Sequence, residues 1–388
     1  MPISNPMDIV KKLTSLPHRG AGTKMEKKAA DLLEQYLKSV GASVEREAFT
    51  TPKTYIYEVW WIVGGITFGL MLISILAWLA VALVAFCTLS AFFYFDWRSS
   101  PLSHLPPKAI SENIIAKFSS SAKADKKVIL MAHYDSAPVS MLYLPSMVQG
   151  MRRSIIIGLA LMLLAVFTAL FEAMNIGQPV IFWVRVSLIL YFLGMGIMTG
   201  FDFFRYGYTN GASDNATGTA AAIVTRERLA KNPIPGWNIE VVLTGAEEAG
   251  MVGAKKYFQT HQTELDPENT FILNFDSFGQ GDLKIIRRTG SLTDVVYNNT
   301  LFDTAFKITR ENEQFHNIKQ ADWHTGDFDT IWFARAGIPS LTISAQDENG
   351  LIPYLHRKED TIDNIDEKLP LFAVDFAETI VRHLAKAQ

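Results

Sequence analysis

The chain has 388 residues, of which 49% are hydrophobic, and a formal net charge of -3 at pH 7. Its length suits either two or three average domains or one large α/β domain with insertions, and composition does not choose between them. Acidic and basic residues are mixed along the chain, which excludes the basic face that a nucleic-acid partner requires. The single cysteine, Cys87, excludes an intramolecular disulfide framework and a cysteine zinc site.

The N-terminal segment predicts a helix over residues 8–40, because its apolar side chains recur with a period of about 3.6 residues. Gly41 is placed to end this helix as a C-cap, and a strand is predicted over residues 42–49. The first residues lack the basic start and short apolar core of a signal peptide, so we expect any export to depend on later segments.

Residues 59–95 contain no charged residue and no proline. One straight helix over this run would extend about 55 Å, well past a hydrocarbon core of about 30 Å. Two antiparallel membrane spans fit better, with a turn near residues 74–78. Aromatic residues at both ends of the run, and Trp78 near its middle, are typical of membrane interfaces.

A second apolar pair covers residues 154–171 and 180–201, with a polar, proline-containing linker between them. This pattern also predicts a membrane hairpin. We expect Arg185, the one charge inside it, to reach the lipid headgroups; the alternative is a partner inside the helix bundle. The other interpretation of all four runs is that they are buried core helices. The apolar composition of the runs disfavours this interpretation.

The rest of the chain alternates strand-like and helical segments. Buried strands are predicted over residues 128–132, 239–244, 270–275 and 340–344, and helices over 218–230 and 369–385. Such alternation indicates an α/β fold with a mostly parallel sheet and helices on both faces. The predicted organisation is a discontinuous soluble domain, residues 1–55, 96–153 and 202–388, interrupted by transmembrane hairpins at 56–95 and 154–201.

Side chains that can bind metal follow the predicted strands, at the sheet edge where open α/β folds build their sites. His133 ends the first buried strand, and Asp135 could accept a hydrogen bond from its imidazole and so fix its tautomer. Asp214 lies in a glycine-flanked loop before a helix, where its carboxylate could bridge two metal ions or cap the helix. Taken alone, each residue is more typical of a structural role.

The adjacent acids Glu247 and Glu248 follow the next strand. Because neighbouring side chains diverge, one could bind a metal while the other moves a proton of an activated water; the alternative is a solvated acidic pair. Asp276 lies in an apolar run, where an unpaired carboxylate is costly, so a metal or an arginine is expected beside it. His356 lies in a polar stretch after the last strand. It is a candidate metal ligand only because it occurs together with the other residues.

In combination these motifs resemble the co-catalytic zinc peptidase family that includes leucine-type aminopeptidases, glutamate carboxypeptidase and glutaminyl cyclase. The resemblance covers most of the part outside the apolar runs. It implies two zinc ions per chain, bound by His133, Asp214, Glu248, Asp276 and His356. In this scheme His133 and Asp276 bind one ion, Glu248 and His356 bind the other, and Asp214 bridges them. It also implies that Asp135 orients His133 and that Glu247 is the general base and acid.

The sequence departs from the family pattern in three places. Thr330 stands where many members have a histidine. Leu355 stands where some members have a tyrosine that stabilises the oxyanion, although Tyr354 is next to it. The second apolar hairpin is inserted between His133 and Asp214, two residues expected to share a metal.

We therefore expect a multi-pass membrane zinc exopeptidase, most simply an aminopeptidase that removes N-terminal residues from peptides. The insertion beside the site suggests that its mouth lies near the lipid bilayer and favours apolar peptides. The alternatives are a one-zinc aminoacyl transferase similar to glutaminyl cyclase, a carboxypeptidase that binds acidic substrates through Arg287 and Arg288, and an inactive receptor or scaffold of the same fold.

Basic residues flank the apolar hairpins on the side of the soluble domain, whereas Glu172 is the charged residue of the second hairpin's far loop. The positive-inside rule therefore predicts a cytoplasmic catalytic domain. The flanking basic residues are Lys53, Arg98, Arg152, Arg153 and Arg205.

Overall fold

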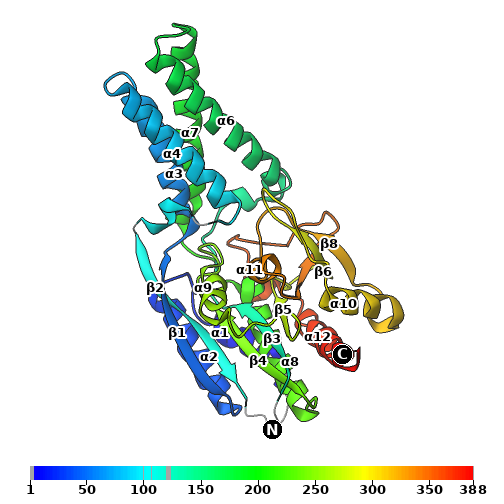
Figure 1. Cartoon of the computed structure of the whole chain (residues 1–388). Helices are drawn as coiled ribbons and strands as arrows, with labels where there is room; N and C mark the ends of the chain where they lie inside the picture. Colours follow the sequence, from blue (N-terminus) through cyan, green and yellow to red (C-terminus); the bar gives the residue numbers. More distant parts are fainter. Residues whose placement is uncertain (1–3, 99, 106, 119–123, 388) are drawn as a thin grey trace.

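The computed structural model describes residues 4–98, 100–105, 107–118 and 124–387. They form a body built around one sheet and a bundle of four long helices that projects from one end of it (Figure 1). The predicted soluble domain begins at Met1 and ends at Gln388, two residues that lie outside the described ranges.

A mixed sheet with strand order β1-β2-β4-β3-β5-β9-β6-β7 forms the centre of the body, and β8 pairs with β6. The central strands β4, β3, β5 and β9 are parallel, whereas β1, β2, β6 and β7 join by antiparallel pairing. The expected α/β fold is confirmed. The strands are β1 (Ser43–Pro52), β2 (Lys108–Lys117), β3 (Lys126–His133), β4 (Trp237–Thr244), β5 (Thr270–Phe275), β6 (Asp282–Thr289), β7 (Val295–Val296), β8 (Lys319–Asp322) and β9 (Ser340–Gln346).

Helices cover both faces of this sheet, because successive side chains of a strand point to opposite faces. On β3, Val128 and Leu130 pack in the larger core with α1, α2, α8, α10 and α12, whereas Ile129 and Met131 pack against α9 and α11. These helices are α1 (Pro6–Thr14), α2 (Lys24–Ser39), α8 (Gly218–Lys231), α9 (Val252–His261), α10 (Thr300–Glu311), α11 (Ile331–Arg335) and α12 (Leu369–Ala387).

The N-terminal segment forms two helices, so the prediction of one helix over residues 8–40 is wrong. α2 begins at a capping box: Thr23 Oγ1 accepts a hydrogen bond from Glu26 N (3.2 Å), and Glu26 Oε2 accepts one from Gly22 N (2.6 Å). Because α1 and α2 are separate, the chain between them can reach the sheet edge where the candidate ligands lie. Gly41 follows α2 at φ +89°, as expected for the residue after a helix end.

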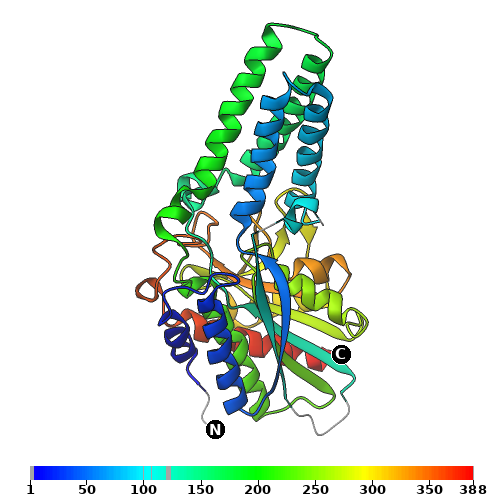
Figure 2. The same ribbon diagram turned by 90° about the vertical axis from the view of Figure 1, so that its left-hand side faces the viewer.

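Among the described residues, four helices are long and apolar enough to cross a membrane, by length and composition. They stand side by side on the body, with the turns that connect them at the far end (Figure 2). The first pair turns at residues 73–76, close to the predicted position. The helices are α3 (Tyr55–Leu72), α4 (Ala77–Phe95), α6 (Met151–Ala173), which follows the short α5 (Pro145–Val148), and α7 (Val180–Tyr206).

Arg185 lies in the far half of the bundle and has protein partners there. Its Nη1 is 2.9 Å from Glu172 Oε1 and donates a hydrogen bond to Ser74 Oγ at 3.0 Å. Glu172 belongs to α6 and Ser74 to the α3–α4 turn, so this arginine ties the two hairpins together. The structure thus favours the second interpretation of Arg185, a partner within the bundle.

Candidate metal centre

The predicted ligands meet at the carboxyl ends of the central parallel strands, beneath the helix bundle. His133 is the last residue of β3, and Asp276 follows β5 directly. Glu248 follows β4, whereas Asp214 precedes α8 and His356 lies on the loop after β9. Parallel pairing of β4, β3 and β5 therefore brings together residues that are far apart in the sequence.

These five residues form two triads that share Asp214. The ligand atoms of His133, Asp214 and Asp276 lie within 4.8 Å of one another, as do those of Asp214, Glu248 and His356. His133 Nε2 is 3.2 Å from Asp214 Oδ1 and 3.6 Å from Asp276 Oδ2. His356 Nε2 is 2.9 Å from Glu248 Oε2 and 3.5 Å from Asp214 Oδ2. The two oxygens of Asp214 thus face the histidines of different triads.

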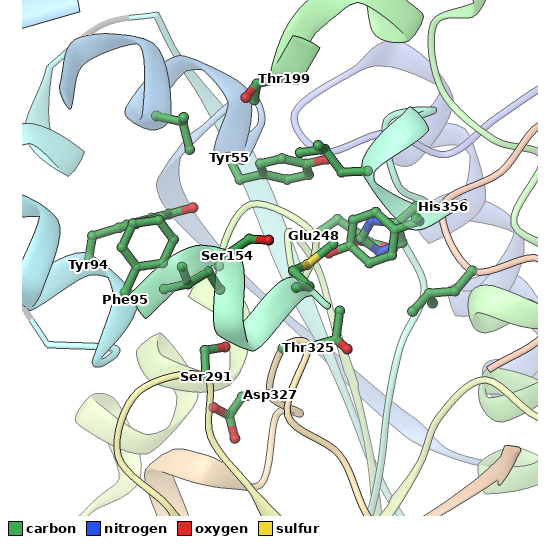
Figure 3. Close-up of a pocket in the computed structure, with 18 of the residues that line it drawn as sticks. Tyr55, Tyr94, Phe95, Ser154, Thr199, Glu248, Ser291, Thr325, Asp327 and His356 are labelled. Atoms are coloured by element: carbon green, nitrogen blue, oxygen red, sulfur yellow. The ribbon is translucent and has the colours of Figure 1, made fainter. Parts of the chain in front are cut away.

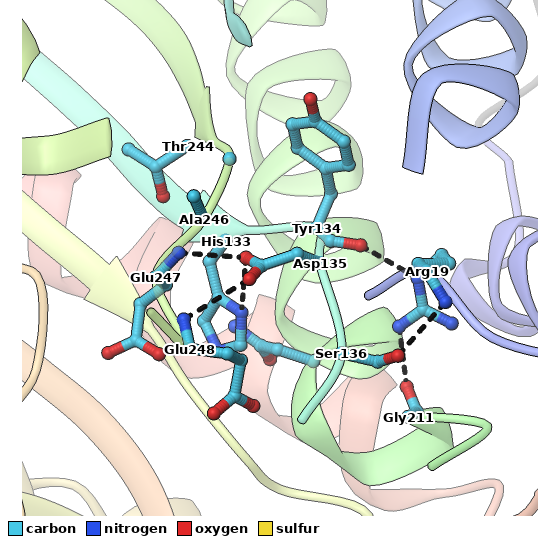
Figure 4. A network of polar contacts seen from close by, with 12 residues as sticks. Arg19, His133, Tyr134, Asp135, Ser136, Gly211, Thr244, Ala246, Glu247 and Glu248 are labelled. Atoms are coloured by element: carbon cyan, nitrogen blue, oxygen red, sulfur yellow. Dashed lines mark hydrogen bonds and ion pairs between the residues drawn. The ribbon is translucent and has the colours of Figure 1, made fainter. Parts of the chain in front are cut away.

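Asp135 is buried behind His133, with its Oδ1 3.4 Å from the imidazole Nδ1. Its carboxylate also accepts hydrogen bonds from the backbone N–H groups of Glu247 (3.0 Å) and Glu248 (3.1 Å), as Figure 4 shows. One carboxylate therefore lies against the histidine and hydrogen-bonds the turn that carries the two glutamates. Glu247 lies outside the two triads that share Asp214 and lines the cavity above them, and its carboxylate forms a third group of possible ligand atoms with His133 and Glu248.

Two further carboxylates support the site, and sequence reasoning missed both. Asp360 accepts hydrogen bonds from Ser213 N (2.7 Å) and Asp214 N (3.1 Å). Glu26 Oε1 accepts one from Ala246 N at 3.2 Å, next to the glutamate pair. The capping box of α2 could have placed Glu26, whereas Asp360 has no local signal because its partners lie 146 and 147 residues away.

Arg19 is fully buried and connects the segment after β3 to the loop before α8. Its Nε donates a hydrogen bond to Tyr134 O, its Nη1 to Asn210 O and its Nη2 to Gly211 O, each at 2.7 Å (Figure 4). The first segment directly follows His133, and the second directly precedes Asp214, the residue that both triads share. The guanidinium therefore holds the two halves of the site together.

Replacing Arg19 with methionine is expected to lower the free energy of unfolding by roughly 3 kcal/mol, because two buried carbonyls and one partly buried carbonyl lose their donor and each unsatisfied buried acceptor costs about 1–3 kcal/mol. Thermal melting of the purified protein measures the effect. The matched control is Arg382→Met on α12, whose guanidinium is partly exposed and is expected to contribute about 0.5 kcal/mol or less. Equal melting shifts for both variants would contradict this role of Arg19.

Burial changes the acidity of the site. It raises the pKa of Glu247 and of Glu248 well above the usual range, and it raises the pKa of Asp276 to about 7. Burial also acts to raise the pKa of Asp214, but the hydrogen bond and charge of His133 outweigh it and lower that pKa. So many buried acids in one place need a cation beside them to remain ionised together.

The residues present fit a zinc centre. Burial lowers the pKa of His356 to about 4, so its imidazole is neutral near pH 7 and has a lone pair to offer a metal ion. Two buried oxygens, Oδ2 of Asp214 and Oε1 of Glu248, accept no hydrogen bond from the described residues. Histidine nitrogens and carboxylate oxygens are donors that zinc binds in proteins.

A cavity of about 300 Å³ lies above the triads and continues between the helices of the bundle (Figure 3). Two tyrosines line it beside His356: the ring centroids of Tyr55 and Tyr143 lie 6.3 Å and 4.0 Å from that of His356. Tyr354, the tyrosine considered from the sequence, is not among the lining residues. The aromatic hydroxyls nearest the site therefore come from other segments, one of them the start of α3.

Two other sequence features lie outside the cavity lining. Thr330 is buried and forms hydrogen bonds with Tyr297 (2.8 Å) and Thr342 (2.9 Å), so its departure from the family pattern affects packing. Arg287 and Arg288 of β6 pair with acids, among them Asp322 at 3.1 Å from Arg287 Nη2. The arginines required by the acidic-substrate carboxypeptidase alternative are thus engaged elsewhere.

A comparison with solved structures finds similar folds among zinc aminopeptidases and in a glutaminyl cyclase. The zinc aminopeptidase BSAP from Bacillus subtilis is 15% identical, with a TM-score of 0.59 over 98% of this chain and 95% of that one. An aminopeptidase from Aneurinibacillus sp. strain AM-1 is 15% identical, with a TM-score of 0.58 over 98% and 93%. Fimbriiglobus ruber glutaminyl cyclase is 13% identical, with a TM-score of 0.58 over 99% and 96%.

The protein therefore has the fold of the zinc aminopeptidase and glutaminyl cyclase group, and the resemblance expected from the sequence is confirmed. Within that class, residues 197–377 match the model of peptidase family M28. The family match covers less than half of the chain and agrees with a peptidase fold. A search of the curated proteins gives no match.

Proposed function

We propose that the protein is a membrane-anchored zinc aminopeptidase that holds two zinc ions. The observation that carries this proposal is the position of Asp214, whose two oxygens face the histidines of two different triads. A carboxylate shared in this way suits a bridge between two ions. His133 and Asp276 would complete one coordination sphere, and Glu248 and His356 the other.

In this proposal the chain's own residues orient the reactants and move the proton. Bound zinc would supply a Lewis acid and lower the pKa of a water molecule to about 7. Glu247, beside the triads, takes the proton of the attacking water and delivers it to the leaving amine nitrogen. Asp135 keeps the His133 imidazole and the Glu247 backbone in place during the reaction. Tyr55 and Tyr143 line the side of the cavity next to His356, where the oxyanion would form.

We further propose that α3, α4, α6 and α7 span a membrane and that the body lies in the cytoplasm. The basic residues that flank the helices lie at the end of the bundle next to the body. At the far end, the charges of Glu172 and Arg185 cancel in one ion pair. This asymmetry agrees with the positive-inside rule. Protection of the body from protease in inside-out vesicles would contradict it.

The test combines zinc analysis of the detergent-purified protein with hydrolysis of matched peptides that have free or blocked N-termini. About two zinc ions per chain and cleavage of free N-termini alone are expected. A single zinc ion with cyclisation of N-terminal glutamine would favour the glutaminyl cyclase alternative, since the triad of Asp214, Glu248 and His356 is complete without a second ion. Loss of both activities in zinc-loaded protein would favour a receptor or scaffold.

A further inference from the structure

The part of the cavity away from the triads is an apolar chamber between the membrane-span helices. Its wall includes Ile62 and Val63 of α3, Phe95 of α4, Leu159 and Met162 of α6, and Met198 of α7. Figure 3 shows that Thr199, on α7, lies farther from His356 than Tyr55 does, so the chamber leads away from the candidate ligands into the bundle. A substrate bound at the triads can therefore extend into it.

The part of the chamber that the four helices form is poor in groups that could satisfy a peptide backbone, although Trp97 and Asp327 line the cavity on the side of the body. The polar side chains that the four helices contribute to its lining are Tyr55, Tyr94, Ser154 and Thr199, and none is charged. The Thr199 hydroxyl already donates to the Met195 carbonyl within α7 at 2.8 Å. Each residue of a peptide would bring one N–H and one C=O group into this chamber, and an unpaired amide costs several kcal/mol there. A hydrocarbon chain brings no such group.

Methionines give the chamber wall an adaptable shape. Met151 and Met162 of α6 and Met195 and Met198 of α7 all line it. Methionine side chains are unbranched and have three rotatable bonds, so they follow the contour of a flexible apolar ligand. A wall of this kind suits linear chains of different lengths better than one rigid side chain.

We propose that the chamber binds a long hydrocarbon chain carried by the N-terminal residue of the substrate, so that the enzyme selects peptides whose first residue is lipid-modified. This inference rests on the proposed aminopeptidase function. Water adds to the carbonyl carbon of the first peptide bond, the C–N bond breaks, and the amine leaves with a proton. The released product is the first amino acid with its hydrocarbon chain attached.

The test uses amides of one fluorescent amine whose N-terminal residue has a linear alkyl side chain that grows from ethyl to decyl. Burial of a methylene contributes about 0.8 kcal/mol, so kcat/KM is expected to rise up to about fourfold with each one until the chamber is filled. Partitioning of long substrates into detergent is the same for every variant. Chain-length profiles are therefore compared as ratios of variant to wild type.

Leucine substitutions at Gly158 of α6 and Gly194 of α7 provide a matched comparison of positions inside and outside the chamber lining. A Cβ atom at Gly158, which lines the chamber, would meet Tyr191 Oη at 3.9 Å, whereas one at Gly194 would meet nothing within 4 Å. Gly158→Leu is expected to fill the chamber and to abolish the preference for long chains, while Gly194→Leu, outside the lining, keeps it. Met162→Ala enlarges the chamber and is expected to move the preferred chain length upwards. The Gly194→Leu variant should cleave the ethyl substrate at the wild-type rate.

A wild-type kcat/KM that does not change with chain length would overturn the inference while leaving the aminopeptidase function intact. The same holds if the Gly158→Leu and Met162→Ala profiles both match wild type. Equal cleavage of peptides that begin with several ordinary apolar residues would show that the chamber accepts a backbone, and cleavage of N-acylated amides alone would place the chain on the amine. If zinc-loaded protein does not cleave even the ethyl substrate, the proposed function fails as well.

Discussion

Replacing Glu247 with glutamine is expected to lower kcat by a factor of roughly 10²–10⁴, the usual contribution of a general acid and base. The amide has nearly the shape of the carboxylate but cannot take the proton of the attacking water. Zinc content should change little, because both triads that share Asp214 stay complete, although Glu247 also belongs to a third group with His133 and Glu248. Steady-state kinetics and metal analysis of the same preparation give both values.

The neighbouring glutamate supplies the control for this experiment. Glu248→Gln should lose zinc together with activity, because Glu248 belongs to the second triad. The pair of variants separates proton transfer from metal binding at two consecutive positions. Near-normal turnover by Glu247→Gln, or loss of zinc from it, would contradict the role proposed for Glu247.

Asp214→Asn is expected to weaken the binding of both zinc ions by more than the roughly 10- to 100-fold typical of losing a residue that only supports a ligand. The asparagine keeps one oxygen but loses the charge and the second acceptor, so it cannot face both histidines. Zinc titration followed by calorimetry measures both affinities.

Asp360→Asn is the matched control for Asp214→Asn, since Asp360 supports Asp214 through its backbone. We expect at most a roughly 100-fold loss of affinity from this change. If Asp214→Asn weakened the binding of one zinc ion and left the binding of the other unchanged, Asp214 would be a ligand of one metal ion and not a bridge. Unchanged binding of both zinc ions would show that Asp214 is not a metal ligand.

Strong local patterns explain what the sequence predicted well. The four buried central strands and the four apolar helices depend on composition over several consecutive residues, which one sequence displays directly. His133, Glu248 and Asp276 end or follow those strands, so a parallel sheet brings them to one edge, whereas Asp214 lies between α7 and α8. Their meeting in the two triads follows from topology.

Features that depend on contacts between distant segments could not be predicted in the same way. Nothing near Asp360 indicates that it accepts hydrogen bonds from the backbone around Asp214. The role of Arg19 is likewise visible only when its three carbonyl partners are in place. The apolar chamber is lined by side chains of four helices. A hydropathy pattern does not specify how these helices are rotated relative to one another, so the chamber could not be predicted.

The position of the α6–α7 hairpin between His133 and Asp214 has a consequence for biosynthesis. These two residues belong to the same triad, but the chain between them contains both helices of the hairpin. In a chain made from the N-terminus, His133 leaves the ribosome before α6 and α7, and Asp214 after them. With the hairpin in a bilayer, as we propose, membrane insertion precedes completion of the metal centre. If α6 and α7 insert as they emerge, the nascent protein would reach the membrane before its metal centre is complete.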